Sequence, residues 1–209
     1  MAADQPALMT LIRAIGVDDA AALRQLAASP ALAGVRIAQG ATRQAAKDYY
    51  LEPIAHYVYA GDSALHVAAA AYRCEIAEKL IALGADLRAR NRRGTEPLHY
   101  AADGAPGASM WNPDAQAAII AMLIAAGADP NATDNSGVMP LHRAVRTRCA
   151  AAVKALLAGG ADARANNRNG SSPMQLATRS TGRGGSGSPE AKAQQIEIVR
   201  LLEEAMGPR

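Results

Sequence analysis

The side chains of this chain that could carry metal or redox chemistry are its four histidines and two cysteines. His66, His99 and His142 each follow a leucine and recur at intervals of 33 and 43 residues. If each lies in one layer of a helical stack, neighbouring histidines are about 8 to 10 Å apart, whereas the ligands of one zinc ion lie about 2 Å from it. Cys74 and Cys149 then lie two layers apart, beyond the limit of about 7 Å between the Cα atoms of a disulfide. We predict neither a shared metal site nor a disulfide.

One glycine-rich segment matches a nucleotide-binding fingerprint. Residues 182–187 read Gly-Arg-Gly-Gly-Ser-Gly, which is G-x-G-x-x-G. In a dinucleotide site this segment follows a β-strand and opens a helix, so that backbone amides converge on the pyrophosphate. Here the preceding residues, 174–178, are predicted to be helical, and we interpret the match as accidental. The chain also has no Gly-Lys-Ser/Thr loop and no G-x-S-x-G or H-E-x-x-H motif. We predict a protein that is not an enzyme and uses no cofactor.

Arginine supplies 18 of the 22 basic residues, in a chain with a net charge of +3 and a pI near 9.0. Its planar guanidinium pairs with carboxylates and phosphates. Four arginines fall within six residues, namely Arg88, Arg90, Arg92 and Arg93. A later segment carries Arg164 and Arg168, whereas residues 131–135 between these two groups are slightly acidic. The arginines form either a local anion-binding surface or a solvated rim.

The composition indicates which elements must position these side chains. Of the 209 residues, 50% are hydrophobic, only 3% are aromatic and 51 are alanine. Small residues with high helix propensity suit helices that pack closely in thin layers, so we predict an all-α stack. The apolar stretch 115–126 is shorter than the roughly 20 residues of a membrane-spanning helix, and no export signal is visible. With only two cysteines, a cytoplasmic location is expected, and secretion without a cleaved signal stays open.

A short motif occurs four times and determines the predicted fold. The copies begin at Gly61, Gly94, Gly137 and Gly170, at offsets of 33, 43 and 33 residues. The tripeptide Gly-Ala-Asp recurs at residues 84–86, 127–129 and 160–162, and we expect the aspartate of each copy to bond local backbone amides. Two short apolar patterns separate the two markers, and each corresponds to about two turns of helix. Proline in the first turn begins one helix, and glycine after the second helix ends it.

This pattern resembles the ankyrin-repeat family, whose 33-residue unit is a turn followed by two antiparallel helices with a T-P-L-H-x-A signature. Residues 97–101 and 140–144 match closely, whereas Ala64 replaces the proline of the first copy and Met174-Gln175 replace Leu-His in the last. The resemblance implies an all-α ankyrin-repeat solenoid of stacked helix-turn-helix units with short hairpin turns. It also implies that the motif histidines hydrogen-bond backbone between neighbouring units.

The predicted organisation divides the chain at residue 60. Residues 1–59 comprise a degenerate capping repeat over 6–30, in which Ile12 and Leu26 keep the repeat register, and a tyrosine-rich connecting segment. Four repeats follow, at residues 60–91, 92–134, 135–168 and 169–209. The tyrosine-rich residues 41–59 either form a second contact surface or fold back and cover the open end of the stack, and we favour the second interpretation.

Two repeats carry inserts between their helices. The first insert, at residues 103–114, contains the only tryptophan, Trp111, and the second, at residues 180–188, is rich in glycine and serine. Stacked repeats share an orientation, so both loops are expected along one edge. We favour a tolerated, flexible insertion over a functional loop, because the entropy of loop closure grows slowly with length.

A repeat stack presents its turns and the exposed face of its first helices to a partner. The predicted partner-binding residues combine the arginines of the turns with large side chains that often become binding hot spots. They are Arg88, Arg90, Arg92, Arg93, Tyr100, Arg143, Arg164, Arg168 and Trp111. The family's usual role implies a non-catalytic protein-protein interaction module or adaptor, which presents an arginine-rich concave repeat surface to an acidic or mixed protein partner. The alternative is that the same arginines bind an anionic ligand, either nucleic acid or a nucleotide. We expect a monomer that does not bind membranes.

Overall fold

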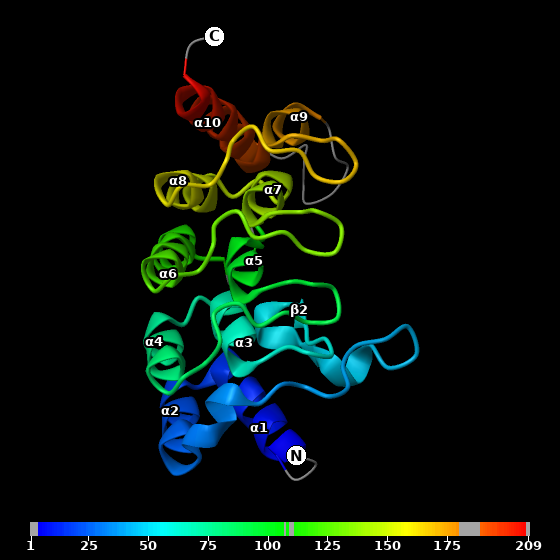
Figure 1. Ribbon diagram of the computed structural model, residues 1–209, viewed down its shortest axis with the longest axis vertical. Coiled ribbons are helices and arrows are strands. Elements are labelled where there is room, and N and C mark those ends of the chain that lie inside the picture. The colour runs from blue at the N-terminus through cyan, green and yellow to red at the C-terminus, as the bar shows by residue number, and fades with distance from the viewer. Residues whose placement is uncertain (1–3, 107, 109–110, 180–188, 208–209) are drawn as a thin grey trace. The chain divides into compact units, whose positions relative to one another are not determined.

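The computed structural model describes residues 4–106, 108, 111–179 and 189–207 (Figure 1). The chain divides into two compact units, residues 1–100 and residues 101–209. The boundary falls within the short helix α5 (Pro97–Ala102). Among the described residues, no helix is long and apolar enough to cross a membrane.

The first unit contains two helix pairs and a long connection between them. Helices α1 (Asp4–Val17) and α2 (Asp19–Ala28) form the first pair, and α3 (Ala64–Ala70) and α4 (Cys74–Ala82) form the second. Helix α1 packs on α3, and α2 packs on α4, so the first and second helices form separate layers (Figure 1). Ile12 and Leu26 are fully buried. These two residues of the first pair therefore lie in the core of the unit.

The second unit, taken by itself, also has two layers of helices. Its helices are α6 (Pro113–Ala125), α7 (Pro140–Arg146), α8 (Ala150–Ala158), α9 (Pro173–Thr178) and α10 (Pro189–Met206). Helices α6, α8 and α10 pack in series in one layer, and α7 packs on α9 in the other (Figure 1). Proline occupies the first turn of α6, α7 and α9, where its missing N–H has no helical partner to lose. The predicted all-α fold is confirmed.

The motif histidines hold backbone in place. The Nδ1 atom of His66 accepts a hydrogen bond from the Ser63 amide, so its Nε2–H donates to the Thr95 carbonyl of the next repeat, at 3.1 Å. His142 makes the equivalent pair of bonds, with the Met139 amide and the Ser171 carbonyl. Burial lowers the pKa of both imidazoles, which favours the neutral form that these bonds require. The predicted structural role is confirmed at these two positions.

The tyrosine-rich segment forms an enlarged turn between the first two helix pairs. Its two ends pair with each other, because the Ile37 amide donates to the Asp62 carbonyl at 2.7 Å and the Ala41 amide donates to the Val58 carbonyl at 2.8 Å. Between them lie a two-stranded antiparallel sheet, β1 (Tyr50–Leu51) and β2 (His56–Tyr57), and the short 3₁₀ turns η2 (Lys47–Tyr49) and η3 (Glu52–Ile54). A further 3₁₀ turn, η1 (Pro30–Gly34), precedes it.

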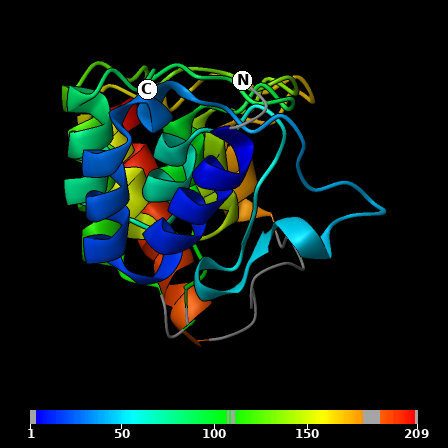
Figure 2. The same cartoon turned by 90° about the horizontal axis from the view of Figure 1, so that it is seen from below.

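Seen from below, this segment extends sideways from α1 and α2 (Figure 2). The prediction that it covers the open end of the stack is therefore wrong. The physical reason is that its two ends are hydrogen-bonded to each other as a hairpin, which directs the segment outward.

The insert of the second unit is held by its side chains, at least in its described part. The indole Nε1–H of Trp111 donates to Oε1 of the fully buried Gln116, and Nε2 of Gln116 donates to the carbonyls of Ala101 and Asp103. A methyl group at Gly104 would lie 2.5 Å from Sγ of Cys149, so the chain passes close to the core here. The expectation of a merely flexible insertion is wrong for these residues, because they supply the partners of a buried amide. The glycine-rich insert at residues 180–188, with the fingerprint match, lies outside the described residues.

Candidate partner-binding surface

The arginine-rich turn is built on Asn91, which is buried beneath it. Oδ1 of Asn91 accepts the amides of Arg93 at 2.8 Å and Thr95 at 3.1 Å, which closes the turn. The Arg92 amide donates to the Ala60 carbonyl at 2.8 Å. Gly61 allows this approach, because its φ is +89° and a Cβ there would lie 2.7 Å from Cα of Asn91. The backbone that carries the arginines is thus fixed from below.

The four guanidinium groups of this turn reach the surface of the first unit. Arg88, Arg90, Arg92 and Arg93 are all exposed. The guanidinium carbons of Arg92 and Arg93 each lie 5.2 Å from the centre of the Tyr59 ring, within the range of a cation–π interaction. Arg92 also donates to the Ala41 carbonyl. The enlarged turn at residues 41–59 therefore supports one side of the arginine cluster.

Arg36, which was not among the predicted site residues, adds a fifth cation. Its guanidinium pairs with Asp86 at 2.8 Å and donates to the Arg90 carbonyl at 3.4 Å. Oδ1 of Asp86 accepts the Arg88 amide, so this carboxylate caps the turn, as predicted for the Gly-Ala-Asp segments. The buried Glu96 lies 3.9 Å from Arg90. Five arginines face two carboxylates here, and the surface carries an excess of positive charge.

Tyr100 lies in a buried polar cluster and not on the exposed face where it was expected. Only 2% of the residue is exposed. Its hydroxyl contacts both carboxylate oxygens of Asp62, at 2.8 and 2.9 Å, and Nδ2 of Asn91 donates to Asp62 and to the Tyr100 hydroxyl oxygen. The expected exposure is wrong, because the buried carboxylate of the preceding layer draws the phenol inward. Tyr100 supports the arginine turn from below.

Arg143 is also buried, in an ion-pair cluster of the second unit. Its guanidinium lies 2.7 Å from Asp103 and 3.3 Å from Asp134. Burial opposes the charged form, but the two carboxylates outweigh it and raise the pKa of Arg143. Burial likewise opposes ionisation of Asp134, yet the Val138 and Ser136 amides and Arg143 hold its pKa below the ordinary value. The expected exposure of Arg143 is wrong, since the guanidinium neutralises carboxylates inside the unit.

The remaining predicted residues lie in the second unit, apart from the arginine cluster along the chain. Arg164 and Arg168 are exposed, but each donates to a backbone carbonyl, of Met206 and Asn135 respectively. Trp111 is partly buried and bonded to Gln116. These side chains join neighbouring turns or fix the insert, and the arginine-rich turn of the first unit is the stronger candidate surface.

The sequence spacing between a turn residue and a residue of the following helix indicates the two buried clusters. Asn91 and Tyr100 lie nine residues apart, as do Asp134 and Arg143. In each pair the first residue closes the turn and the second follows the motif histidine. Tyr59 and Arg36 had no such signal, because they lie outside the four repeated copies.

Among the described residues, no three His, Cys, Asp or Glu side chains are grouped so as to hold a metal ion. Burial raises the pKa of the Cys149 thiol to about 12, and burial also raises the pKa of Cys74. Both thiols therefore remain protonated at neutral pH, which makes them poor nucleophiles.

Comparison with known families identifies the repeats. A family model described as "Ankyrin repeat" matches residues 60–92 and 93–135, and one described as "Ankyrin repeats (many copies)" matches residues 123–177. No curated protein matches the chain. Ankyrin repeats are generally protein-protein interaction modules and are typically non-catalytic. The matches extend over more than half of the sequence, and together with the stacked helix pairs they show that the chain belongs to the ankyrin-repeat family.

Proposed function

We propose that the protein binds an acidic segment of another protein through the arginine-rich turn, residues 88–93, with Arg36 beside it. The observation that carries this proposal is the set of four exposed guanidinium groups on a turn closed from below by Asn91. Guanidinium groups pair with carboxylates through two parallel hydrogen bonds. A backbone that is already ordered loses little further entropy on binding.

The local charge supports an acidic partner. Asp86 is paired with Arg36, and Glu96 is buried next to Arg90, so neither carboxylate competes for Arg88 or Arg93 from the outer surface. Tyr59 adds an aromatic face between Arg92 and Arg93. Tyrosine and arginine together are typical of residues that carry binding energy in protein interfaces.

The proposal is tested by replacing Arg88, Arg90, Arg92 and Arg93 with serine. Partners are captured from native cell extract on the immobilised chain and identified by mass spectrometry, and their affinities are then measured with purified components. We expect at least tenfold weaker binding, which corresponds to about 1.4 kcal/mol. Undiminished binding would overturn the proposal.

Matched controls separate charge from stability. Replacing Arg13, Arg24, Arg146 and Arg179, which are exposed elsewhere, with serine removes the same charge and should leave binding within about threefold of the original, since dispersed surface charges contribute little. The single variant Arg92→Ser loses the contacts with Tyr59 and with the Ala41 carbonyl. Its melting temperature measures how much these contacts stabilise the protein.

Salt dependence separates the protein partner from an anionic polymer that would use the same arginines. Binding dominated by phosphates weakens by orders of magnitude between about 50 and 200 mM salt, because each neutralised phosphate releases counterions. Protein binding with apolar anchors should change far less. A steep salt dependence together with tight binding of an oligonucleotide would favour the alternative.

A further inference from the structure

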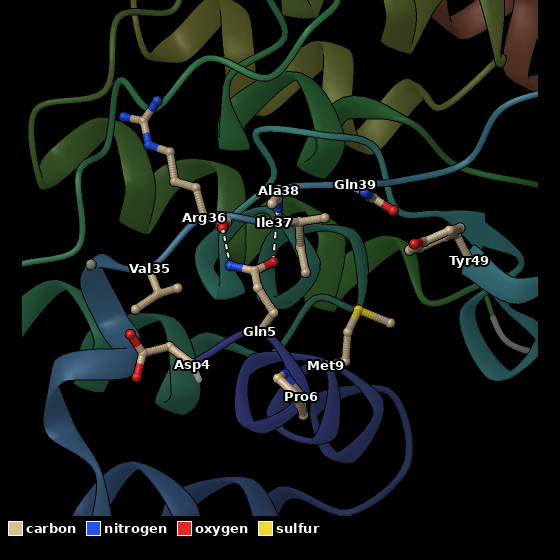
Figure 3. A pocket seen from close by; sticks show the side chains of 11 residues that line it. Asp4, Gln5, Pro6, Met9, Val35, Arg36, Ile37, Ala38, Gln39 and Tyr49 are labelled. Carbon is tan, nitrogen blue, oxygen red and sulfur yellow. Dashed lines mark hydrogen bonds between the residues drawn. The ribbon is translucent and has the colours of Figure 1, made fainter. Parts of the chain in front are cut away.

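A pocket of about 900 Å³ lies in the first unit, between the beginning of α1 and residues 34–39 (Figure 3). Apolar side chains form much of its lining, from Pro6 and Met9 of α1 and from Val35, Ile37 and Ala38 opposite them. Tyr49 and Gln39 lie towards one end, and Asp4 lies towards the other (Figure 3). The volume is in the range of sites that enclose small ligands or large side chains.

The wall formed by residues 36–38 is fixed on both sides. Nε2 of Gln5 donates to the Arg36 carbonyl at 2.9 Å, and the Ala38 amide donates to Oε1 of Gln5 at 2.8 Å, as the dashed lines of Figure 3 show. On the other side, the Ile37 amide donates to the Asp62 carbonyl and the Gly61 amide donates to the Ile37 carbonyl, both at 2.7 Å. These backbone groups already have partners, so the pocket is suited to an inserted side chain and not to an added β-strand.

Arg36 connects this pocket with the arginine-rich turn. Its backbone and stem line the pocket, while its guanidinium points away from it, to Asp86 and the Arg90 carbonyl (Figure 3). An apolar pocket and a cationic turn are therefore separated by the length of one arginine side chain. Asp4, on the opposite rim, repels a carboxylate and directs the acidic part of a ligand towards the arginines.

We propose that the pocket receives a large apolar side chain of the same acidic segment that the arginine-rich turn binds. The ligand is thus an extended peptide segment that carries an apolar residue near its carboxylates. This proposal rests on the proposed function and adds that a large apolar side chain anchors the acidic segment. The pocket residues, 4–49, precede the matched repeats at 60–177, so this subsite is a feature of the N-terminal part of this chain.

The test uses the full chain and synthetic peptides as probes. Each peptide carries three consecutive glutamates and one tryptophan, placed one to five residues before or after them, and each has a partner with alanine in place of tryptophan. Affinities are measured by isothermal titration calorimetry. At the best spacing, the tryptophan peptide should bind at least tenfold more tightly than its alanine partner.

Variants of the pocket residues test whether the tryptophan of the peptide binds in the pocket. Ala38→Phe fills the pocket from an exposed position, and Met9→Gln makes its lining polar at similar volume. Both should abolish the tryptophan advantage and leave the affinity of the alanine peptide unchanged. Ala27→Phe, at an exposed position of α2 that does not line the pocket, is the matched control and should preserve it. Melting temperatures establish that each variant is folded.

The outcomes distinguish the two proposals. Equal binding of tryptophan and alanine peptides, with both weakened by Arg88→Ser and Arg93→Ser, would overturn the pocket proposal and leave the acidic-segment proposal intact. A tryptophan advantage that survives both pocket variants would also overturn the pocket proposal. Absence of binding by every peptide, or binding that does not depend on the arginines, would overturn both.

Discussion

At the scale of single residues, the side chain after each motif histidine is matched to the side chain that closes the preceding turn. Tyr100 meets Asn91, and Arg143 meets Asp134, while a carboxylate of the preceding layer completes each cluster. In the first cluster the neutral phenol of Tyr100 lies beside the neutral amide of Asn91. In the second the cation of Arg143 lies beside the carboxylate of Asp134. In both clusters the buried polar groups are hydrogen-bonded, and in the second cluster the guanidinium also compensates the charge of the carboxylates.

The first prediction concerns the ion-pair cluster of the second unit. Arg143→Tyr removes the cation and leaves Asp103 and Asp134 near each other, so it should destabilise the protein by about 3 kcal/mol. The double variant Arg143→Tyr, Asp134→Asn reproduces the combination found at Tyr100 and Asn91, and it should recover at least about 1 kcal/mol of that loss. Urea unfolding followed by circular dichroism measures both. A double variant no more stable than the single one would contradict this pairing.

The second prediction concerns pH. Because burial depresses the folded-state pKa of His66 and His142, their stabilising effect is present above the unfolded pKa, about 6.5, and is lost as the pH falls below it. The free energy of unfolding should therefore decrease between about pH 7.5 and 5.5, by at most about 1.4 kcal/mol per pH unit for each histidine.

His142→Gln supplies the control for this pH dependence. The chain already uses glutamine at the equivalent position, where Oε1 of Gln175 accepts the Ser172 amide at 2.9 Å. The variant should unfold with a shallower dependence on pH, because it has one titrating imidazole fewer. Identical slopes for the two proteins would show that His142 does not contribute.

Residues whose partners are local could be predicted from the sequence, whereas residues whose partner comes from another layer could not. Asp86, Asp129 and Asp162 each accept the amide two residues later, as their turn positions predicted. Tyr100 and Arg143 were expected on the exposed face, because the repeat pattern does not reveal that Asp62 and Asp103 lie within reach. Their burial depends on contacts between layers, which the spacing within one repeat cannot show.

At the scale of elements, the insert at residues 103–114 is joined to helix α6 by Gln116. This amide contacts Trp111 and the carbonyls of Ala101 and Asp103, and it is fully buried. Loop length and composition predicted a tolerated insertion, but neither indicates whether a later helix provides a buried partner. In this chain the buried Gln116 side chain of α6 provides that partner.

The third prediction tests this connection. Gln116→Met keeps the volume but leaves the carbonyls of Ala101 and Asp103 and the indole N–H of Trp111 without this partner, which should destabilise the protein by about 1 to 3 kcal/mol. Because Trp111 is the only tryptophan, its fluorescence reports the insert directly, and its emission should shift to longer wavelength as water reaches the ring. Gln44→Met, at an exposed position, should change neither property. Unchanged emission and stability in Gln116→Met would mean that the insert does not depend on this amide.

At the scale of the whole molecule, the repeats predicted the fold, whereas the destination of residues 41–59 could not be predicted. The repeated motif specifies helices, turns and their order, since each unit must bury its apolar face against a neighbour. The tyrosine-rich segment has no repeat register, and its place depends on bonds such as that from the Ala41 amide to the Val58 carbonyl.

The fourth prediction is that residues 1–59 stabilise the repeats that follow. Helix α1 packs on α3 with Leu8, Leu11 and Ile12 fully buried. A chain that begins at Ala60 exposes that interface, so it should melt at a lower temperature and aggregate more readily. Calorimetry and size-exclusion chromatography measure the two effects. Val17→Ala, at a position that is 62% exposed, is the control and should behave like the unaltered chain.

If the shortened chain were as stable and monodisperse as the complete one, the N-terminal helix pair would have no stabilising role. The exposed tyrosines of the enlarged turn, Tyr50 and Tyr57, would then become stronger candidates for a binding function.

The nine-residue pairing also constrains how such repeats can recombine. A crossover between the turn and the following helix would combine Asp134 with a tyrosine, or Asn91 with an arginine. The first combination buries two carboxylates without a cation, and the second leaves a guanidinium with one carboxylate fewer. A crossover outside this interval transfers both members together. Viable chimeras of these repeats should therefore have their junctions in the second helix or in the loop before it, and new binding surfaces would arise by exchange of whole turn-and-helix segments.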